Sequence, residues 1–158
     1  MPSFENMTHL RILPRHILLA EDDDDDSMLF QEALGELQIN TNLKRVKDGE
    51  ELMQSLHNPN NILPDILFLD INMPRKNGFE CLVEIKKNDR LKKLPVIIFS
   101  TSSGKDLVNK MYNAGASQYI CKPNEFVQLK KIILKALIAE RTPVYSQPPI
   151  EQFLLEFK

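Results

Sequence analysis

Residues 65–70 read Asp-Ile-Leu-Phe-Leu-Asp, four apolar residues between two aspartates, and a turn-rich loop follows at 72–78. A run this short and apolar at every position indicates a β-strand that is buried on both faces. Two further runs have the same character, His-Ile-Leu-Leu-Ala at 16–20 and Pro-Val-Ile-Ile-Phe at 95–99. Continuous apolar strands are typical of a parallel sheet, because helices then cover both of its faces.

Stretches with helical periodicity alternate with these strands. Residues 27–37, for example, place Leu29, Ala33, Leu34 and Leu37 on one stripe. The predicted strands are 16–20, 43–46, 65–70, 95–99 and 116–121, and the predicted helices are 27–37, 49–56, 79–88, 105–113 and 126–141. Five successive βα units predict an α/β, doubly wound fold with a parallel sheet.

The composition fits one soluble globular domain. The chain has 158 residues, of which 42% are hydrophobic and 27% charged, so it needs no metal or disulfide to fold. The net charge of −2 excludes a broadly basic nucleic-acid binder. No export signal and no apolar window of about 18 residues is present, so we expect no membrane partner and a cytoplasmic location. Cys81 and Cys121 lack a paired spacing and are interpreted as reduced thiols.

We expect three segments: an N-terminal extension at 1–14, the folded domain at 15–141, and a proline-containing linker with a short apolar tail at 142–158. The tail places Ile150, Phe153, Leu154 and Phe157 at helical spacing. It is expected either to dock on the domain, which is slightly preferred, or to mediate homodimerisation.

Polar residues follow the carboxyl ends of the strands, where open parallel sheets bind their ligands. These residues are Glu21, Asp22, Asp70, Ser100 and Lys122. Clustered carboxylates repel one another unless a cation lies among them, and oxygen ligands favour a hard ion such as Mg²⁺. A carboxylate oxygen can then act as a nucleophile toward a phosphoryl group, whose charge the ammonium and hydroxyl would stabilise.

The acidic run at 21–26 also has a plainer interpretation as a solvated loop, and a lone Asp70 or Lys122 as a loop cap or surface charge. Because the run directly follows a buried strand, we expect its first two members, Glu21 and Asp22, to be metal ligands. Residues 23–26 are interpreted as helix capping and surface charge. The arrival of all these groups at successive strand ends favours a shared site.

The motifs that carry this chemistry are Ile-Leu-Leu-Ala-Glu-Asp-Asp at 17–23, Asp-Ile-Leu-Phe-Leu-Asp-Ile-Asn-Met-Pro at 65–74, Asn-Gly-Phe-Glu at 77–80, Pro-Val-Ile-Ile-Phe-Ser at 95–100 and Tyr-Ile-Cys-Lys-Pro at 119–123. In this order they resemble the response-regulator receiver family, the CheY-like phosphoacceptor domains, over about residues 17–141. The resemblance implies a flavodoxin-like (βα)5 fold with a five-stranded parallel sheet in the order 2-1-3-4-5.

The resemblance also implies a metal and phosphoacceptor site. Asp70 would be the phosphoacceptor. Mg²⁺ would be held by Glu21, Asp22, Asp70 and the backbone carbonyl of Asn72.

The resemblance further assigns the residues around the phosphoryl group. Lys122 would pair with that group, Ser100 would be the switch hydroxyl, and Tyr119 would be the aromatic whose rotamer reports phosphorylation. The Lys122–Pro123 bond would be cis, which only X–Pro bonds adopt readily. Gly78 would supply unrestricted backbone before the third helix.

The implied function is that of a two-component response regulator. It would accept a phosphoryl group onto Asp70 from the phosphohistidine of a sensor histidine kinase or phosphotransfer protein, and signal to an unknown downstream protein through altered contacts. It would be an enzyme only in slow self-dephosphorylation. The residues after Arg141 are too few for a DNA-binding output domain, so we expect a stand-alone receiver, most like those associated with bacterial phytochrome-type kinases.

Three alternatives fit the residues less well. A haloacid-dehalogenase-type phosphatase needs a second Asp two residues after its nucleophile, where this chain has Asn72. An FMN-binding flavodoxin needs a first loop that cradles phosphate, whereas the carboxylates from Glu21 onward would repel it. A pseudo-receiver or phosphorelay adaptor usually lacks an acid or the lysine, and none is missing here.

Overall fold

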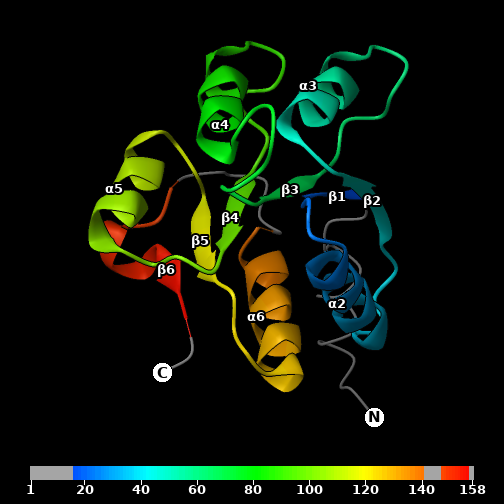
Figure 1. The fold of residues 1–158 in the computed structure, drawn as a ribbon, viewed down its shortest axis with the longest axis vertical. Helices are drawn as coiled ribbons and strands as arrows, with labels where there is room; N and C mark the ends of the chain where they lie inside the picture. Colours follow the sequence, from blue (N-terminus) through cyan, green and yellow to red (C-terminus); the bar gives the residue numbers. More distant parts are fainter. Residues whose placement is uncertain (1–15, 141–146, 157–158) are drawn as a thin grey trace.

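A parallel β-sheet runs through the middle of the molecule (Figure 1). The computed structural model describes residues 16–140 and 147–156. The strands are β1 (His16–Ala20), β2 (Asn42–Val46), β3 (Ile66–Leu69), β4 (Val96–Ser100), β5 (Gln118–Cys121) and β6 (Leu154–Leu155). They lie in the order β2-β1-β3-β4-β5-β6, and every neighbouring pair is parallel. The predicted order of the first five strands is confirmed, and the sixth strand is an addition.

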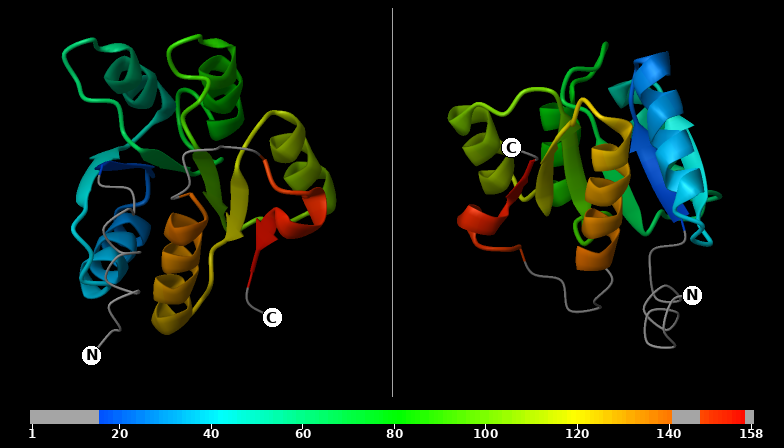
Figure 2. Two further views of the ribbon diagram at one scale, coloured as in Figure 1. Left: turned by 180° about the vertical axis from the view of Figure 1, so that it is seen from behind. Right: turned by 90° about the horizontal axis from the view of Figure 1, so that it is seen from below.

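Helices cover both faces of the sheet. They are α2 (Asp24–Glu36), α3 (Gly49–His57), α4 (Gly78–Lys87), α5 (Lys105–Asn113) and α6 (Phe126–Ala139), with a short 3₁₀ turn η1 (Ile150–Gln152). Helices α2 and α6 lie side by side on one face, and α3, α4 and α5 lie on the other (Figures 1 and 2). None of the helices in the described ranges combines the length and apolarity needed to span a membrane.

Two hydrophobic cores lie on the two faces of the sheet. Leu67 and Leu69 of β3 belong to the core under α3, α4 and α5. Phe68, between them in the chain, belongs to the core under α2 and α6, where its ring meets Phe30 edge to face. This alternation along a strand that is buried at all four positions explains why its sequence is apolar throughout.

Short polar side chains start three of the helices. Asp23, Asp48 and Asn77 each accept a hydrogen bond from a backbone N–H in the first turn of α2, α3 and α4. Asn77 and Glu80 form a complete capping box. The capping role predicted for the acidic run is therefore confirmed at Asp23, but α2 begins at Asp24, earlier than predicted.

The C-terminal tail packs against the domain, which was the preferred of its two alternatives, but it is not helical. Gln147 donates hydrogen bonds from its side-chain amide to the carbonyls of Tyr112 and Ala116, both at 2.7 Å. Phe153 is fully buried, with its ring centroid 5.0 Å from that of Tyr112 and 6.2 Å from that of Tyr119. Strand β6 then pairs with β5, so the tail extends the sheet. The predicted N-terminal extension at 1–14, residues 142–146 of the predicted linker and Phe157 lie outside the described residues.

Candidate functional site

Three carboxylates meet at the carboxyl edge of the sheet. Glu21 and Asp22 follow β1, and Asp70 follows β3, which is its neighbour in the sheet. The Asp70 backbone N–H donates to the carbonyl of Ala20 at 3.0 Å, which fixes the two strand ends side by side. One oxygen from each carboxylate lies within 4.8 Å of the others. The convergence predicted from the strand ends is present in the fold.

Burial makes this cluster electrostatically costly. Glu21 and Asp70 are buried, whereas Asp22 is exposed. Burial, the largest cause, and the neighbouring Asp70 carboxyl raise the pKa of Glu21 to about 7, against the opposing effect of Lys122. The ionised form of Glu21 is therefore disfavoured in this cluster, and a cation bound beside it would favour that form.

Lys122 lies over the cluster from the end of β5. Its Nζ atom is 2.5 Å from Glu21 Oε1 and 3.9 Å from Asp70 Oδ2. Burial acts to lower the pKa of this ammonium, and the surrounding carboxylates outweigh burial, so the pKa lies above its usual value. The Lys122–Pro123 bond is trans, so the cis prediction is wrong; trans is the lower-energy isomer of an X–Pro bond.

The loop after β3 wraps around Asp70. The Asn72 N–H lies 3.4 Å from Asp70 Oδ1, and Asn72 itself is exposed. The Gly78 N–H donates to the carbonyl of Ile71 at 2.9 Å and so closes the loop onto the strand end. Gly78 does not have a positive φ angle. The prediction that this position needs the backbone freedom of glycine is therefore wrong. Its role is close packing, because a Cβ at this position would collide with Asp70.

Ser100 and Tyr119, the predicted switch residues, are both fully buried. The Ser100 hydroxyl accepts a hydrogen bond from the Ser102 N–H at 3.2 Å. The Tyr119 hydroxyl donates to the Ser102 carbonyl at 2.5 Å. The two side chains are thus linked through the loop that follows β4, close to the end of the strand that neighbours Lys122.

The residues present fit a divalent cation. The donors are carboxylate oxygens, the ligand type that Mg²⁺ prefers, and a cation would relieve their mutual repulsion. Within the part of the chain that the structure describes, this is the one group of three such side chains.

Two charged residues of the site were missed at the sequence level. Asp26 of α2 accepts a hydrogen bond from Lys122 Nζ at 3.0 Å, although it was interpreted as surface charge. Arg45 of β2 donates from Nε to the Glu21 carbonyl at 3.0 Å and from Nη1 to Asp24 at 2.9 Å. This ion pair lowers the pKa of Asp24. No local pattern marks either residue, since both contacts depend on how β1, β2 and α2 meet.

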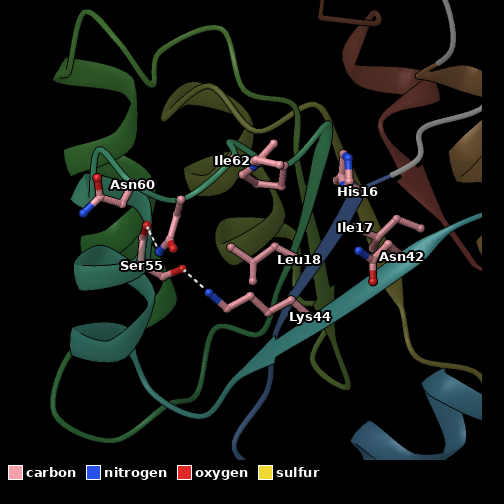
Figure 3. Close-up of a pocket in the computed structure, with 10 residues that line it drawn as sticks. His16, Ile17, Leu18, Asn42, Lys44, Ser55, Asn60 and Ile62 are labelled. Atoms are coloured by element: carbon pink, nitrogen blue, oxygen red, sulfur yellow. Dashed lines mark hydrogen bonds between the residues drawn. The ribbon is translucent and has the colours of Figure 1, made fainter.

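A hollow lies at the edge of the sheet opposite the acid cluster. It is a cavity of about 240 Å³ at the start of β1 and β2, lined by His16, Leu18, Lys44, Ser55 and Ile62, among others (Figure 3). Lys44 Nζ donates to Ser55 Oγ at 3.1 Å across it. It contains none of the acid cluster and faces the amino ends of the strands, so it is separate from the candidate site.

Comparison with known proteins agrees with this geometry. The family model of the response regulator receiver domain matches residues 17–134. The response regulator Rcp1 of Synechocystis is 36% identical over 124 residues, which are 76% of this chain and 84% of Rcp1.

Solved structures give the same result. The phosphorylated cyanobacterial phytochrome response regulator RcpA superposes with a TM-score of 0.72 at 36% identity, covering 77% of this chain and 90% of RcpA. The Mn²⁺-bound form of Rcp1 superposes with a TM-score of 0.73 at 33% identity, covering 86% of this chain and all of that one. The fold, the strand-end acids with their lysine, and these similarities agree: this chain belongs to the response regulator receiver domain family.

Proposed function

We propose that Asp70 accepts a phosphoryl group from the phosphohistidine of a sensor histidine kinase or phosphotransfer protein, in a reaction that requires Mg²⁺. The observation that carries this proposal is the meeting of Glu21, Asp22 and Asp70 within 4.8 Å, with the Lys122 ammonium 3.9 Å from Asp70. A nucleophilic carboxylate, further hard oxygen donors and a fixed cation are what phosphoryl transfer needs from a protein.

In the transfer, an Asp70 carboxylate oxygen forms a bond to phosphorus while the phosphorus–nitrogen bond of the phosphohistidine breaks. The imidazole leaves with the electron pair of that bond. Lys122 would stabilise the negative charge of the phosphoryl oxygens, because its ammonium is held beside Asp70 by the buried carboxylate of Glu21 and by Asp26. We propose that water later hydrolyses the acyl phosphate, which limits the signal in time.

The metal would be held by Glu21, Asp22, Asp70 and the backbone carbonyl of Asn72. When bound, Mg²⁺ would neutralise charge on the carboxylates and on the phosphoryl oxygens. The exposed position of Asp22 and Asn72 leaves this side of the cluster open to solvent, as exchange of ion and donor requires.

We also infer where the partner docks. Met28 and Leu29 of α2 and Val127 of α6 are exposed apolar side chains, and they lie within a few residues of Asp26 and Lys122. Because α2 and α6 are neighbours and both begin just after a strand's carboxyl end, we infer that these side chains form an apolar margin beside the acid cluster. A protein that presents a phosphohistidine to Asp70 would cover this margin.

Phosphorylation would change the protein's contacts through Ser100 and Tyr119. The new group adds about −1.5 to −2 charge in a confined site, which would draw Ser100 and Lys122 toward it. Tyr119 and Ser100 bind the same loop, so this movement would reach the surface near β5 and bias a two-state equilibrium. A cytoplasmic location, which the free thiols of Cys81 and Cys121 favour, is part of this proposal.

The test is incubation with acetyl phosphate and Mg²⁺, read by intact mass. Wild-type protein should gain the mass of one phosphoryl group, and Asp70→Asn should gain none. Asp25→Asn, which removes an exposed charge two residues past the cap of α2, is the matched control and should behave as wild type. No gain in wild type at saturating donor and Mg²⁺ would favour a pseudo-receiver instead.

A further inference from the structure

The Lys122 ammonium contacts three carboxylates unequally. Its Nζ atom lies 2.5 Å from Glu21, 3.0 Å from Asp26 and 3.9 Å from Asp70. The first two distances are those of charge-assisted hydrogen bonds, and the third is too long for one. The ammonium is therefore held beside the nucleophile but not bonded to it.

We propose that Asp26 is a positioning residue that holds the Lys122 ammonium off Asp70 and keeps room for a phosphoryl oxygen between them. The inference rests on the proposed roles of Asp70 and Lys122. It concerns the free protein before transfer, when the nucleophile has to remain available.

The start of α2 fixes Asp26 in place. Asp23 caps the helix, and its side chain accepts a hydrogen bond from the Asp26 backbone N–H at 2.8 Å. This contact fixes the Asp26 backbone, and its side chain reaches Lys122, which lies 96 residues further along the chain. The carboxylate is 39% exposed, so it is partly hydrated and not forced into the contact by burial.

The geometry explains why a second anchor is needed. With Glu21 as its sole bonded partner, the ammonium would be drawn toward the next carboxylate of the cluster, which is Asp70. A direct ion pair would engage an oxygen of the nucleophile and bring the ammonium toward the position that a phosphoryl oxygen has to take. Asp26 pulls the ammonium away from Asp70, and the ring of Phe99, 5.0 Å from Nζ, provides a further cation–π contact.

The arrangement is then ready for transfer. Once the phosphoryl group is on Asp70, one of its oxygens would lie between Asp70 and the ammonium, where a short charge-assisted bond can form with little movement of the lysine. This is electrostatic preorganisation, in which the cation is placed for the charge that the reaction creates.

The test compares Asp26→Asn with Asp25→Asn. Both substitutions remove one negative charge from the first turn of α2, so both change the helix-dipole interaction alike. Only Asp26→Asn removes the carboxylate that binds Lys122. With acetyl phosphate and fixed Mg²⁺, Asp26→Asn should react on the order of tenfold more slowly, since a small misplacement of a reacting group costs up to about 10²-fold. Asp25→Asn should react at the wild-type rate, and Asp26→Glu, which keeps the carboxylate, should recover part of the loss.

A second measurement needs neither donor nor metal. The side-chain ¹⁵N resonance of the Lys122 ammonium, assigned by its loss in Lys122→Arg, should shift and exchange its protons faster in Asp26→Asn but not in Asp25→Asn. An unchanged rate together with an unchanged resonance in Asp26→Asn would overturn the proposal. If wild-type protein takes up no phosphoryl group, the proposed function fails, while the resonance still decides whether Asp26 holds Lys122.

Discussion

The main chain of Gly78 lies so close to that of Asp70 that a Cβ atom on residue 78 would fall 2.3 Å from the Asp70 carbonyl oxygen. The start of α4 is thus packed directly on the backbone of the proposed phosphoacceptor. No movement of a side chain can relieve this contact, because the nearest atoms belong to the main chain.

Gly78→Ala should therefore displace the end of β3 or the start of α4. We expect a loss of about 1–3 kcal/mol in the free energy of unfolding, as for other overpacked sites, together with slower phosphorylation of Asp70. Denaturant unfolding and the acetyl phosphate reaction measure the two effects.

Gly35→Ala is the matched control, since nothing lies within 4 Å of a Cβ there and the residue is helical. It should raise the free energy of unfolding by about 0.5–1 kcal/mol. Equal effects of the two substitutions would contradict the close packing of Gly78 on Asp70.

Divalent metal should stabilise the fold. An ion that binds only the native state raises the free energy of unfolding by about 2.7 kcal/mol at a concentration 100 times its Kd. We expect Mg²⁺ or Mn²⁺ to raise the melting temperature of wild-type protein and a chelator to reverse the rise. Asp22→Asn should remove most of this rise, because it removes one of the three carboxylates of the cluster. Asp22 is exposed, so the substitution should leave the core intact.

Potassium chloride at equal ionic strength controls for screening in that experiment. An undiminished metal response in Asp22→Asn would exclude this residue from the metal site, and a response to potassium chloride of the same size would exclude specific binding.

Phe153→Ala should show whether the tail is part of the folded unit. The ring is fully buried against Tyr112 and Tyr119, so its truncation should cost about 3 kcal/mol, the lower end for a buried aromatic. Ile150→Ala, at a position that is 38% exposed, should change the free energy of unfolding by about 0.5 kcal/mol or less. Similar unfolding curves for wild type and Phe153→Ala would mean that the tail is undocked in solution.

The two thiols should differ in reactivity. Burial raises the pKa of the Cys81 thiol from 9.0 to about 11, so at pH 8–9 its reactive thiolate fraction is far below that of an ordinary cysteine. Cys121 is partly exposed. A disulfide reagent at pH 8 should modify Cys121 in native protein and Cys81 only after unfolding, which Cys121→Ala makes visible. Rapid modification of Cys81 in native Cys121→Ala would contradict the buried position.

Much of the site follows from the sequence because it depends on topology alone. Apolar runs define the parallel strands, and the carboxyl ends of parallel strands share one edge of the sheet. Glu21, Asp70 and Lys122 were therefore predicted to meet, although the chain separates them widely. The length and apolarity of each strand are enough to predict that the strand ends meet, without any knowledge of side-chain contacts.

Asp26 shows where such reasoning stops. Residues 22–26 are all aspartate, so composition cannot distinguish a cap, a ligand and a positioning residue. The distinction depends on the first residue of α2, which was predicted at Ser27 and lies at Asp24. That shift places Asp26 in the first helical turn, from which it reaches Lys122.

The docking of the tail agrees with the preferred alternative, but its local structure was not predicted, for a related reason. Ile150, Phe153 and Leu154 have helical spacing, but residues 150–155 form one 3₁₀ turn and a short strand. The free edge of β5 determines this outcome, since the backbone of Tyr119 donates to the Phe153 carbonyl at 3.0 Å. The edge of β5 is distant in sequence from the tail, so the local sequence of the tail does not indicate this pairing.

We expect the sixth strand also to limit self-association, because it covers the edge of β5. Without it, β5 would present a row of unpaired backbone amides and carbonyls at one rim of the sheet, and such an edge can pair with another chain. With β6 in place, the exposed rim on that side is a strand of two residues, too short to template such pairing. Loss of the last dozen residues should therefore reduce colloidal stability even where the phosphoacceptor site remains intact.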